Sequence, residues 1–82
     1  MAVDHAVLSP LPGTFYRKPA PDAEVFAKEG ATVKVGDVIG LVEVMKQFSE
    51  VHADVAGQVV RFLVENEHAV EPGQPLVMIK TS

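Results

Sequence analysis

The chain has 82 residues, which is enough for one small domain, because domains typically run from about 50 to 250 residues. Seven Lys and Arg residues against eleven Asp and Glu residues give a net charge of −4, which argues against a surface that neutralises nucleic-acid phosphates or sits on anionic lipid. The sequence has no Cys, so disulfides, thiol nucleophiles and Cys-ligated metal sites are excluded.

The amino-terminal segment lacks the features of a secretion signal. An acid, Asp4, stands where such a signal carries basic residues, and Pro10 and Pro12 interrupt any apolar segment behind it. Further along, the longest apolar run, around residues 38–42, is far shorter than the ~20 residues that span a bilayer. We therefore expect a cytoplasmic protein with no membrane partner.

The next candidate element is a short helix at residues 22–29, with Asp22 as the N-cap and Gly30 as the stop. Such a helix has only about two turns, so it would persist only if packing held it in place. Residues 38–44 follow as a run that is apolar on both faces, which is typical of a strand covered on both sides. The β interpretation is favoured for the chain as a whole.

Two later segments alternate apolar and polar residues, which is the pattern of half-buried strands. In residues 47–55 the expected inward side chains are Val51, Ala53 and Val55. In residues 58–64 they are Val60, Phe62 and Val64, with Arg61 on the opposite side. Turn signals separate these segments at short intervals, at residues 12–13, 29–30, 36–37, 56–57 and 72–73. Many short strands at this spacing predict an all-β barrel or sandwich.

An internal repeat organises the chain. Residues 33–39 align with residues 70–76 at a shift of 37 positions, and residues 12–17 align with residues 56–61 at a shift of 44 positions. The first half therefore holds seven extra residues, which fall between Arg17 and Glu29. Two prolines in this interval, Pro19 and Pro21, deny ladder hydrogen bonds, so we expect the extra residues to project as a loop.

The segment between the two halves is predicted to be a hairpin tip. A strand at residues 38–44 leads into it and another leaves at residue 47, so Met45 and Lys46 would form a two-residue turn. Tight hairpins favour Asn-Gly or other glycine-containing pairs, and this turn has neither. Local inconsistencies of this kind tend to mark strained or functional positions.

These features resemble the biotinyl domain of biotin carboxyl carrier proteins of the bacterial acetyl-CoA carboxylase type, within the biotin and lipoyl attachment family. The resemblance rests on Glu-Val-Met-Lys at 43–46, on Gly-Thr-Phe-Tyr-Arg at 13–17 with Pro-Ala-Pro-Asp-Ala at 19–23, and on Gly36-Asp37 before the central strand. It covers residues 9–79. It implies a domain at residues 9–80 behind an amino-terminal tail at residues 1–8.

The fold that this resemblance implies is a flattened β-barrel, a barrel-sandwich hybrid of two four-stranded antiparallel sheets with a pseudo-two-fold repeat. It also implies a thumb-like loop at about residues 18–25, which would place Pro19, Ala20, Pro21 and Asp22 near the cofactor. In that family the tip lysine, here Lys46, carries biotin through an amide bond. Its flanking residues, here Val44, Met45 and Gln47, are the immediate surroundings of the attachment site.

The function that the resemblance implies is that of a non-catalytic carrier with covalent biotin as its cofactor. The partners would be a biotin protein ligase, a biotin carboxylase and a carboxyltransferase that acts on an acyl-CoA, as in fatty acid synthesis. The family usually has Ala and Met where this chain has Val44 and Gln47, which questions recognition by a standard ligase. The alternatives are a lipoyl carrier and an unmodified β-barrel interaction module.

No other cluster of residues predicts chemistry. The three histidines, His5, His52 and His68, lie far apart in sequence without the spacing of metal ligands. Neither Ser9 nor Ser49 belongs to a nucleophile motif, and no glycine-rich phosphate loop is present. We therefore expect neither a metal site nor independent catalysis.

Overall fold

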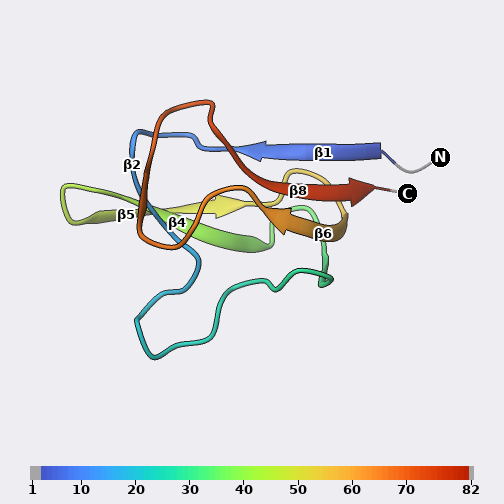
Figure 1. Cartoon of the computed structure of the whole chain (residues 1–82), viewed down its shortest axis with the longest axis horizontal. Coiled ribbons are helices and arrows are strands. Elements are labelled where there is room, and N and C mark those ends of the chain that lie inside the picture. The colour runs from blue at the N-terminus through green and yellow to red at the C-terminus, as the bar shows by residue number, and fades with distance from the viewer. Residues whose placement is uncertain (1–2, 82) are drawn as a thin grey trace.

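The computed structural model describes residues 3–81, which form two antiparallel sheets of four strands each and, within that range, no helix (Figure 1). One sheet has the order β1-β8-β6-β3 and the other the order β5-β4-β2-β7. The predicted flattened, all-β architecture is thereby confirmed, whereas residues 22–29 form turns and coil and not the candidate helix. The strands are β1 (Val3–Leu8), β2 (Gly13–Tyr16), β3 (Thr32–Val33), β4 (Val38–Val44), β5 (Gln47–His52), β6 (Gly57–Phe62), β7 (His68–Val70) and β8 (Pro75–Thr81).

The two sheets are related by the repeat that the sequence predicts. Strands β1 to β4 correspond in order to β5 to β8, and the strand orders of the two sheets match under this correspondence. Backbone hydrogen bonds correspond as well: Gly36 N–H donates to Ala53 O at 2.8 Å, and its counterpart Gly73 N–H donates to Ser9 O at 2.8 Å. The predicted duplication is therefore present in the backbone and not only in residue types.

Two glycines of the repeat, Gly13 and Gly57, allow neighbouring strands to pack closely. A Cβ atom on Gly13 would lie 2.3 Å from Glu43 O, and one on Gly57 would lie 2.3 Å from Lys80 O. Real side chains do not approach backbone that closely, so each glycine lets one strand lie directly against its neighbour. Gly13 and Gly57 are counterparts at the shift of 44, and Glu43 and Lys80 are counterparts at the shift of 37.

The core lies between the two sheets and, apart from Val77, whose counterpart is Gly40, consists of counterpart pairs. Its side chains are apolar and almost fully buried, apart from the hydroxyl of Ser9, which donates to Leu11 O at 2.7 Å. The buried pairs are Phe15 with Val59, Ile39 with Leu76, Val42 with Ile79, Val33 with Val70, Ala27 with Val64, Val7 with Val51, and Ser9 with Ala53.

The prediction of an amino-terminal tail at residues 1–8 is wrong for residues 3–8, which are the ones that the structure describes. Residues 3–8 form β1 and pair with β8 from Val3 opposite Thr81 to Leu8 opposite Pro75. Val7 from this strand is buried in the core. The expected domain start at residue 9 therefore cuts off an edge strand, while residues 1 and 2 lie outside the described residues.

The predicted facing of β6 is also wrong in part. Val59 is opposite Ile79 and Arg61 is opposite Met78, so Val60 is an extra residue in the ladder. This β-bulge reverses the alternation, because one inserted residue shifts all later side chains to the other face. Val59 is consequently buried and Val60 is 42 % exposed, whereas Phe62 and Val64 do pack toward the core as predicted.

Candidate functional site

The tip of the β4–β5 hairpin is a two-residue turn made by Met45 and Lys46. The strands on either side stay paired up to Val44 opposite Gln47, so the turn has no spare residue. Met45 has φ 49° and Lys46 has φ 68°, which is the left-handed region that a type I′ hairpin turn requires at both central positions. The tip thus holds two non-glycine residues in a conformation that each adopts at a cost of roughly 1–2 kcal/mol.

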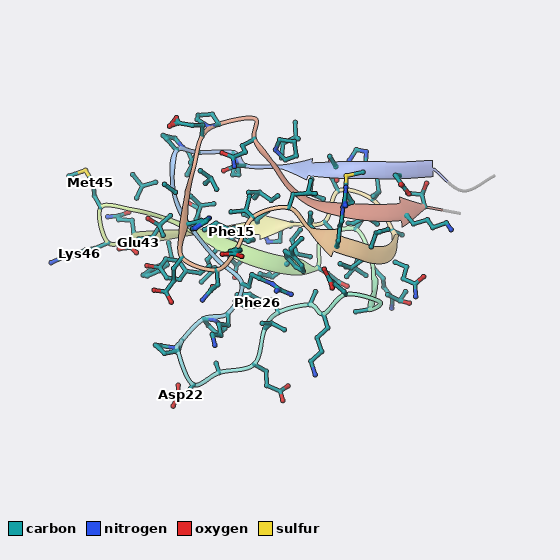
Figure 2. The ribbon with its side chains drawn as sticks, in the orientation of Figure 1. Phe15, Asp22, Phe26, Glu43, Met45 and Lys46 are labelled. Carbon is teal, nitrogen blue, oxygen red and sulfur yellow. The ribbon has the colours of Figure 1, made fainter. Side chains whose placement is uncertain are left out.

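This turn projects both side chains away from the barrel. Met45 is 91 % exposed and Lys46 is exposed, and Figure 2 shows the two side chains pointing into open space at one end of the molecule. The start of β1 and the end of β8 lie at the opposite end (Figure 1). An amine presented in this way is accessible to a partner enzyme from several directions.

The base of the hairpin is tied to the neighbouring strand β2. Tyr16 Oη donates a hydrogen bond to Glu43 Oε1 at 2.8 Å, and the rings of Tyr16 and Phe48 have centroids 6.0 Å apart with a tilt of 57°. This hydrogen bond favours the neutral phenol and raises the pKa of Tyr16, with desolvation and the negative charges of Glu43 and Glu67 acting in the same direction. These contacts fix the side chains immediately beside the tip.

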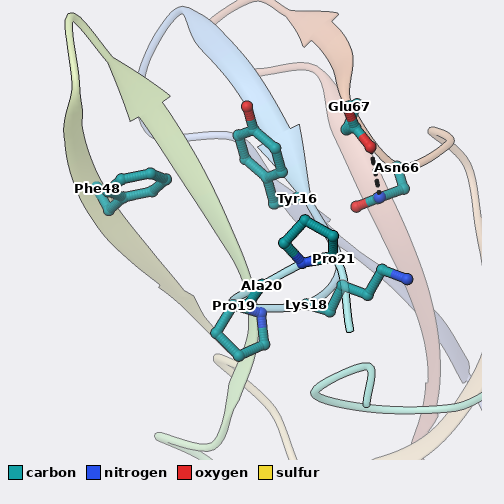
Figure 3. Close-up of a pocket in the computed structure, with 8 residues that line it drawn as sticks. All are labelled: Tyr16, Lys18, Pro19, Ala20, Pro21, Phe48, Asn66 and Glu67. Carbon is teal, nitrogen blue, oxygen red and sulfur yellow. Dashed lines mark hydrogen bonds between the residues drawn. The ribbon is translucent and has the colours of Figure 1, made fainter. Parts of the chain in front are cut away.

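Next to this cluster lies a groove of about 300 Å³. Figure 3 shows Phe48 on one side, Asn66 and Glu67 on the other, and the proline-containing loop below. The groove combines apolar rings with an ammonium, an amide and a carboxylate. Its lining residues are Tyr16, Lys18, Pro19, Ala20, Pro21, Phe48, Asn66 and Glu67.

The loop that forms one wall of the groove is held at its base. Phe26 N–H donates to Arg17 O at 2.9 Å, which closes the loop, and the Arg17 guanidinium lies 3.9 Å from the centroid of the Phe62 ring. Arg17 N–H also donates to Asn66 Oδ1 at 2.8 Å. The extra residues of the first half therefore leave the barrel from a fixed base (Figure 1).

The structure brings together most of the residues predicted to form the site. Lys46 and Met45 form the tip, Val44 packs partly on the core below it, and Gln47 is exposed. On the loop, Pro19, Ala20 and Pro21 line the groove. Asp22 does not line it, because it lies exposed at the far end of the loop (Figure 2).

Five groove residues were not among the predicted site residues: Tyr16, Lys18, Phe48, Asn66 and Glu67. Lys18 lies on the predicted loop, whereas the other four come from β2, from β5 and from the turn before β7, and no local spacing in the sequence links them. A signal was available for Glu67 alone. At the shift of 37 positions its counterpart is Gly30, a residue that forms turns, so an acid at this position stands out from the repeat.

The described residues hold no group of three or more His, Cys, Asp or Glu side chains placed to bind a metal ion. None of their elements is a helix of the length and apolarity that crossing a bilayer requires.

Comparison with known proteins identifies the class to which this hairpin and barrel belong. Residues 5–79 match the family described as "Biotin-requiring enzyme", so the chain belongs to that biotin and lipoyl domain family. The predicted family is confirmed. Biotin, a carboxylic acid that can be joined to an amine, is the cofactor in the family's description.

Three of the curated relatives are described as biotin carboxyl carrier protein of acetyl-CoA carboxylase. The chain is 46 % identical to the protein from Haemophilus influenzae over 93 % of its length, 47 % identical to that from Nostoc over 90 %, and 43 % identical to that from Pseudomonas aeruginosa over 92 %. It covers 49 %, 41 % and 48 % of those proteins, respectively. The chain thus spans about half the length of the curated relatives it matches.

Solved structures support the same class. Similar folds occur within a single-chain, multi-domain long-chain acyl-CoA carboxylase, with a TM-score of 0.79 and 28 % identity, and within the urea carboxylase of Kluyveromyces lactis, with a TM-score of 0.76 and 30 % identity. The matches cover 96 % and 94 % of this chain but only 7 % and 6 % of those proteins. In both, a unit of this size and fold is a small part of a large carboxylase.

Proposed function

We propose that this chain is the biotin-carrying domain of a biotin-dependent carboxylase and that Lys46 is its attachment residue. The observation that carries the proposal is the tip itself, where a strained two-residue turn holds an exposed lysine at the end of a rigid hairpin. In the attachment step, the neutral Nζ of Lys46 would attack the carboxyl carbon of biotin that a biotin protein ligase has activated. The new C–N amide bond replaces the bond to the activating group, which leaves, and the lysine loses its positive charge.

The chain's own residues then act as a holder and not as a catalyst. The hairpin keeps the attachment point at a fixed place on the barrel, and the long arm beyond it sets the effective concentration of the cofactor at each partner active site. Bound biotin supplies a ureido nitrogen that can carry a carboxyl group from one active site to another. The chemistry belongs to the cofactor and the partners.

The partners follow from the same proposal. A biotin protein ligase would load Lys46, a biotin carboxylase would carboxylate the cofactor, and a carboxyltransferase would unload it onto an acyl-CoA. Acetyl-CoA is the substrate class favoured by the relatives described as carriers of acetyl-CoA carboxylase. The cytoplasmic location expected from the sequence stays a prediction.

The test is the intact mass of the protein after co-expression with an active biotin ligase, followed by peptide mapping. We expect one biotinyl group on Lys46, none on a Lys46→Arg variant, and full labelling of a matched Lys34→Arg variant. Lys34 suits this control because it is exposed but lies in a turn between β3 and β4. Biotin uptake by Lys46→Arg at wild-type level would refute the assignment, and a lipoyl adduct would identify the alternative carrier.

An unmodified interaction module remains the second candidate because of Val44 and Gln47. These two residues form the last pair before the turn, so they are the nearest neighbours of any enzyme that reaches Lys46. If they prevent recognition, the wild-type protein should stay unlabelled, and Val44→Ala with Gln47→Met should restore labelling. Failure of the double variant to take up biotin would leave this alternative without its mechanism.

A further inference from the structure

A residue of the groove occupies a backbone position suited to glycine. Glu67 has φ 67°, and its counterpart in the first half, Gly30, has φ 90°. Both residues make the corresponding hydrogen bond: Glu67 N–H donates to Phe15 O at 2.7 Å, and Gly30 N–H donates to Val59 O at 2.7 Å. Glycine adopts this conformation without steric cost, whereas a residue with a Cβ atom does not. The first half of the repeat therefore has glycine at this left-handed position, whereas the second half has a glutamate.

The side chain kept at this cost lies in the groove. Glu67 lines the groove wall opposite Phe48 (Figure 3), and Asn66 Nδ2 donates to Glu67 Oε2 at 3.4 Å. Asn66 is held in turn, because its Oδ1 accepts a hydrogen bond from Arg17 N–H. The acid therefore faces the cavity and not only the solvent.

The polar groups of the groove match a cyclic urea. The ureido ring of biotin has two N–H donors and one carbonyl acceptor. Glu67 supplies a carboxylate acceptor, while Lys18 and Asn66 supply N–H donors, and the rings of Phe48 and Tyr16 offer an apolar wall for the rest of the bicycle. The dithiolane ring of a lipoyl group has no N–H to offer, so this set of groups favours biotin over lipoate.

The groove lies close to the attachment point. Phe48 pairs with Glu43, one pair below Val44 and Gln47, which close the turn. At roughly 3.3 Å per strand residue, the Phe48 wall begins about 7 Å along the hairpin from Lys46. An arm attached to Lys46 Nζ can fold back over that distance.

We propose that Glu67 is a positioning residue for the ureido ring of biotin attached to Lys46, its carboxylate accepting a ureido N–H when the arm folds back into the groove. This inference rests on the proposed function. It assigns to the second half of the repeat a role that its counterpart, Gly30, cannot have. The charge of the acceptor strengthens the hydrogen bond relative to a neutral one.

The test compares biotinylated wild-type protein with Glu67→Gly and Glu67→Gln by the solvent exchange of the two ureido N–H protons in NMR. We expect Glu67→Gly to speed exchange of one N–H about tenfold, the factor that corresponds to losing one ordinary hydrogen bond, and Glu67→Gln to speed it less. Glu65→Gln is the matched control, because Glu65 is the neighbouring exposed acid and does not line the groove. It should exchange as the wild type does.

Folding and loading are checked on the same samples. Glu67→Gly should not lower the melting temperature, because it relieves a left-handed φ, so faster exchange cannot be attributed to unfolding. A loaded Glu67→Gly protein with wild-type ureido exchange would overturn this inference and leave the proposed function intact. A protein that takes up no biotin on Lys46 would instead overturn the proposed function.

Discussion

The turn at Met45 and Lys46 is expected to lower the free energy of unfolding of this protein. A left-handed φ costs roughly 1–2 kcal/mol at each of the two residues. Asn tolerates that region and Gly adopts it freely, although Gly loses about 0.5–1 kcal/mol in chain entropy. Met45→Asn alone should therefore stabilise the fold by about 1 kcal/mol, and Met45→Asn with Lys46→Gly should stabilise it by about 2 kcal/mol.

Thermal unfolding followed by circular dichroism measures this effect. For a domain of this size about 1 kcal/mol corresponds to roughly 4–8 °C in melting temperature, so Met45→Asn should melt about 4–8 °C above the wild type. Urea unfolding should show a higher midpoint with an unchanged slope. Met45→Leu is the matched control, because Met45 is 91 % exposed and its removal loses almost no packing.

The reasoning would be refuted if Met45→Asn melted no higher than Met45→Leu. It would also be refuted if the double variant were less stable than the wild type, since both changes supply residues that a type I′ turn prefers. Met45→Asn keeps the lysine, so its biotin loading can be measured alongside its stability. A more stable and poorly loaded variant would show that the methionine serves the partner enzymes and not the fold.

Other contacts give further expectations. The single tyrosine should ionise above pH 10 in an absorbance titration, and Glu43→Gln should lower the midpoint of that titration. Because folding raises the pKa of Tyr16, the contribution of this group to stability is full below pH 10.0 and is lost as the pH rises through the folded pKa. A titration midpoint that Glu43→Gln leaves unchanged would contradict the hydrogen bond as the cause of the raised pKa. Gly57→Ala should destabilise the fold by about 1–3 kcal/mol in urea unfolding, as expected for overpacking against Lys80 O, and an unchanged midpoint would mean that the strands can separate freely.

The sequence predicted the parts of the fold that depend on repetition. Two alignments at different shifts located both the duplication and the extra residues after Arg17. They could be recognised because a side chain at Gly13 or Gly57 would collide with backbone, so both halves have glycine at this position. The tip was predicted from its position between the two halves, and it was marked as functional because Met45 and Lys46 are poor residues for the turn that this position requires.

What the sequence did not predict depends on single residues in the ladder or on distant segments. The extra residue Val60 reverses the facing of β6, and strict alternation cannot reveal an insertion of one residue. Strand β1 was missed because, of its residues, only Val7 is both buried and identical to its counterpart, Val51. Phe48 and Glu67 meet at one groove only because the two halves of the barrel close on each other.

The repeat also makes the gap between Thr81 and Val3 equivalent to the turn that carries the lysine. Val44 and Gln47 close the hairpin tip, and their counterparts Thr81 and Val3 face each other at the other end of the barrel. A circularly permuted chain could therefore join these ends through Met-Lys and open at the natural tip. Its lysine would occupy an equivalent turn beside the half of the barrel that lacks the extra loop. Such a permutant would separate what the turn contributes to biotin loading from what the loop and groove contribute.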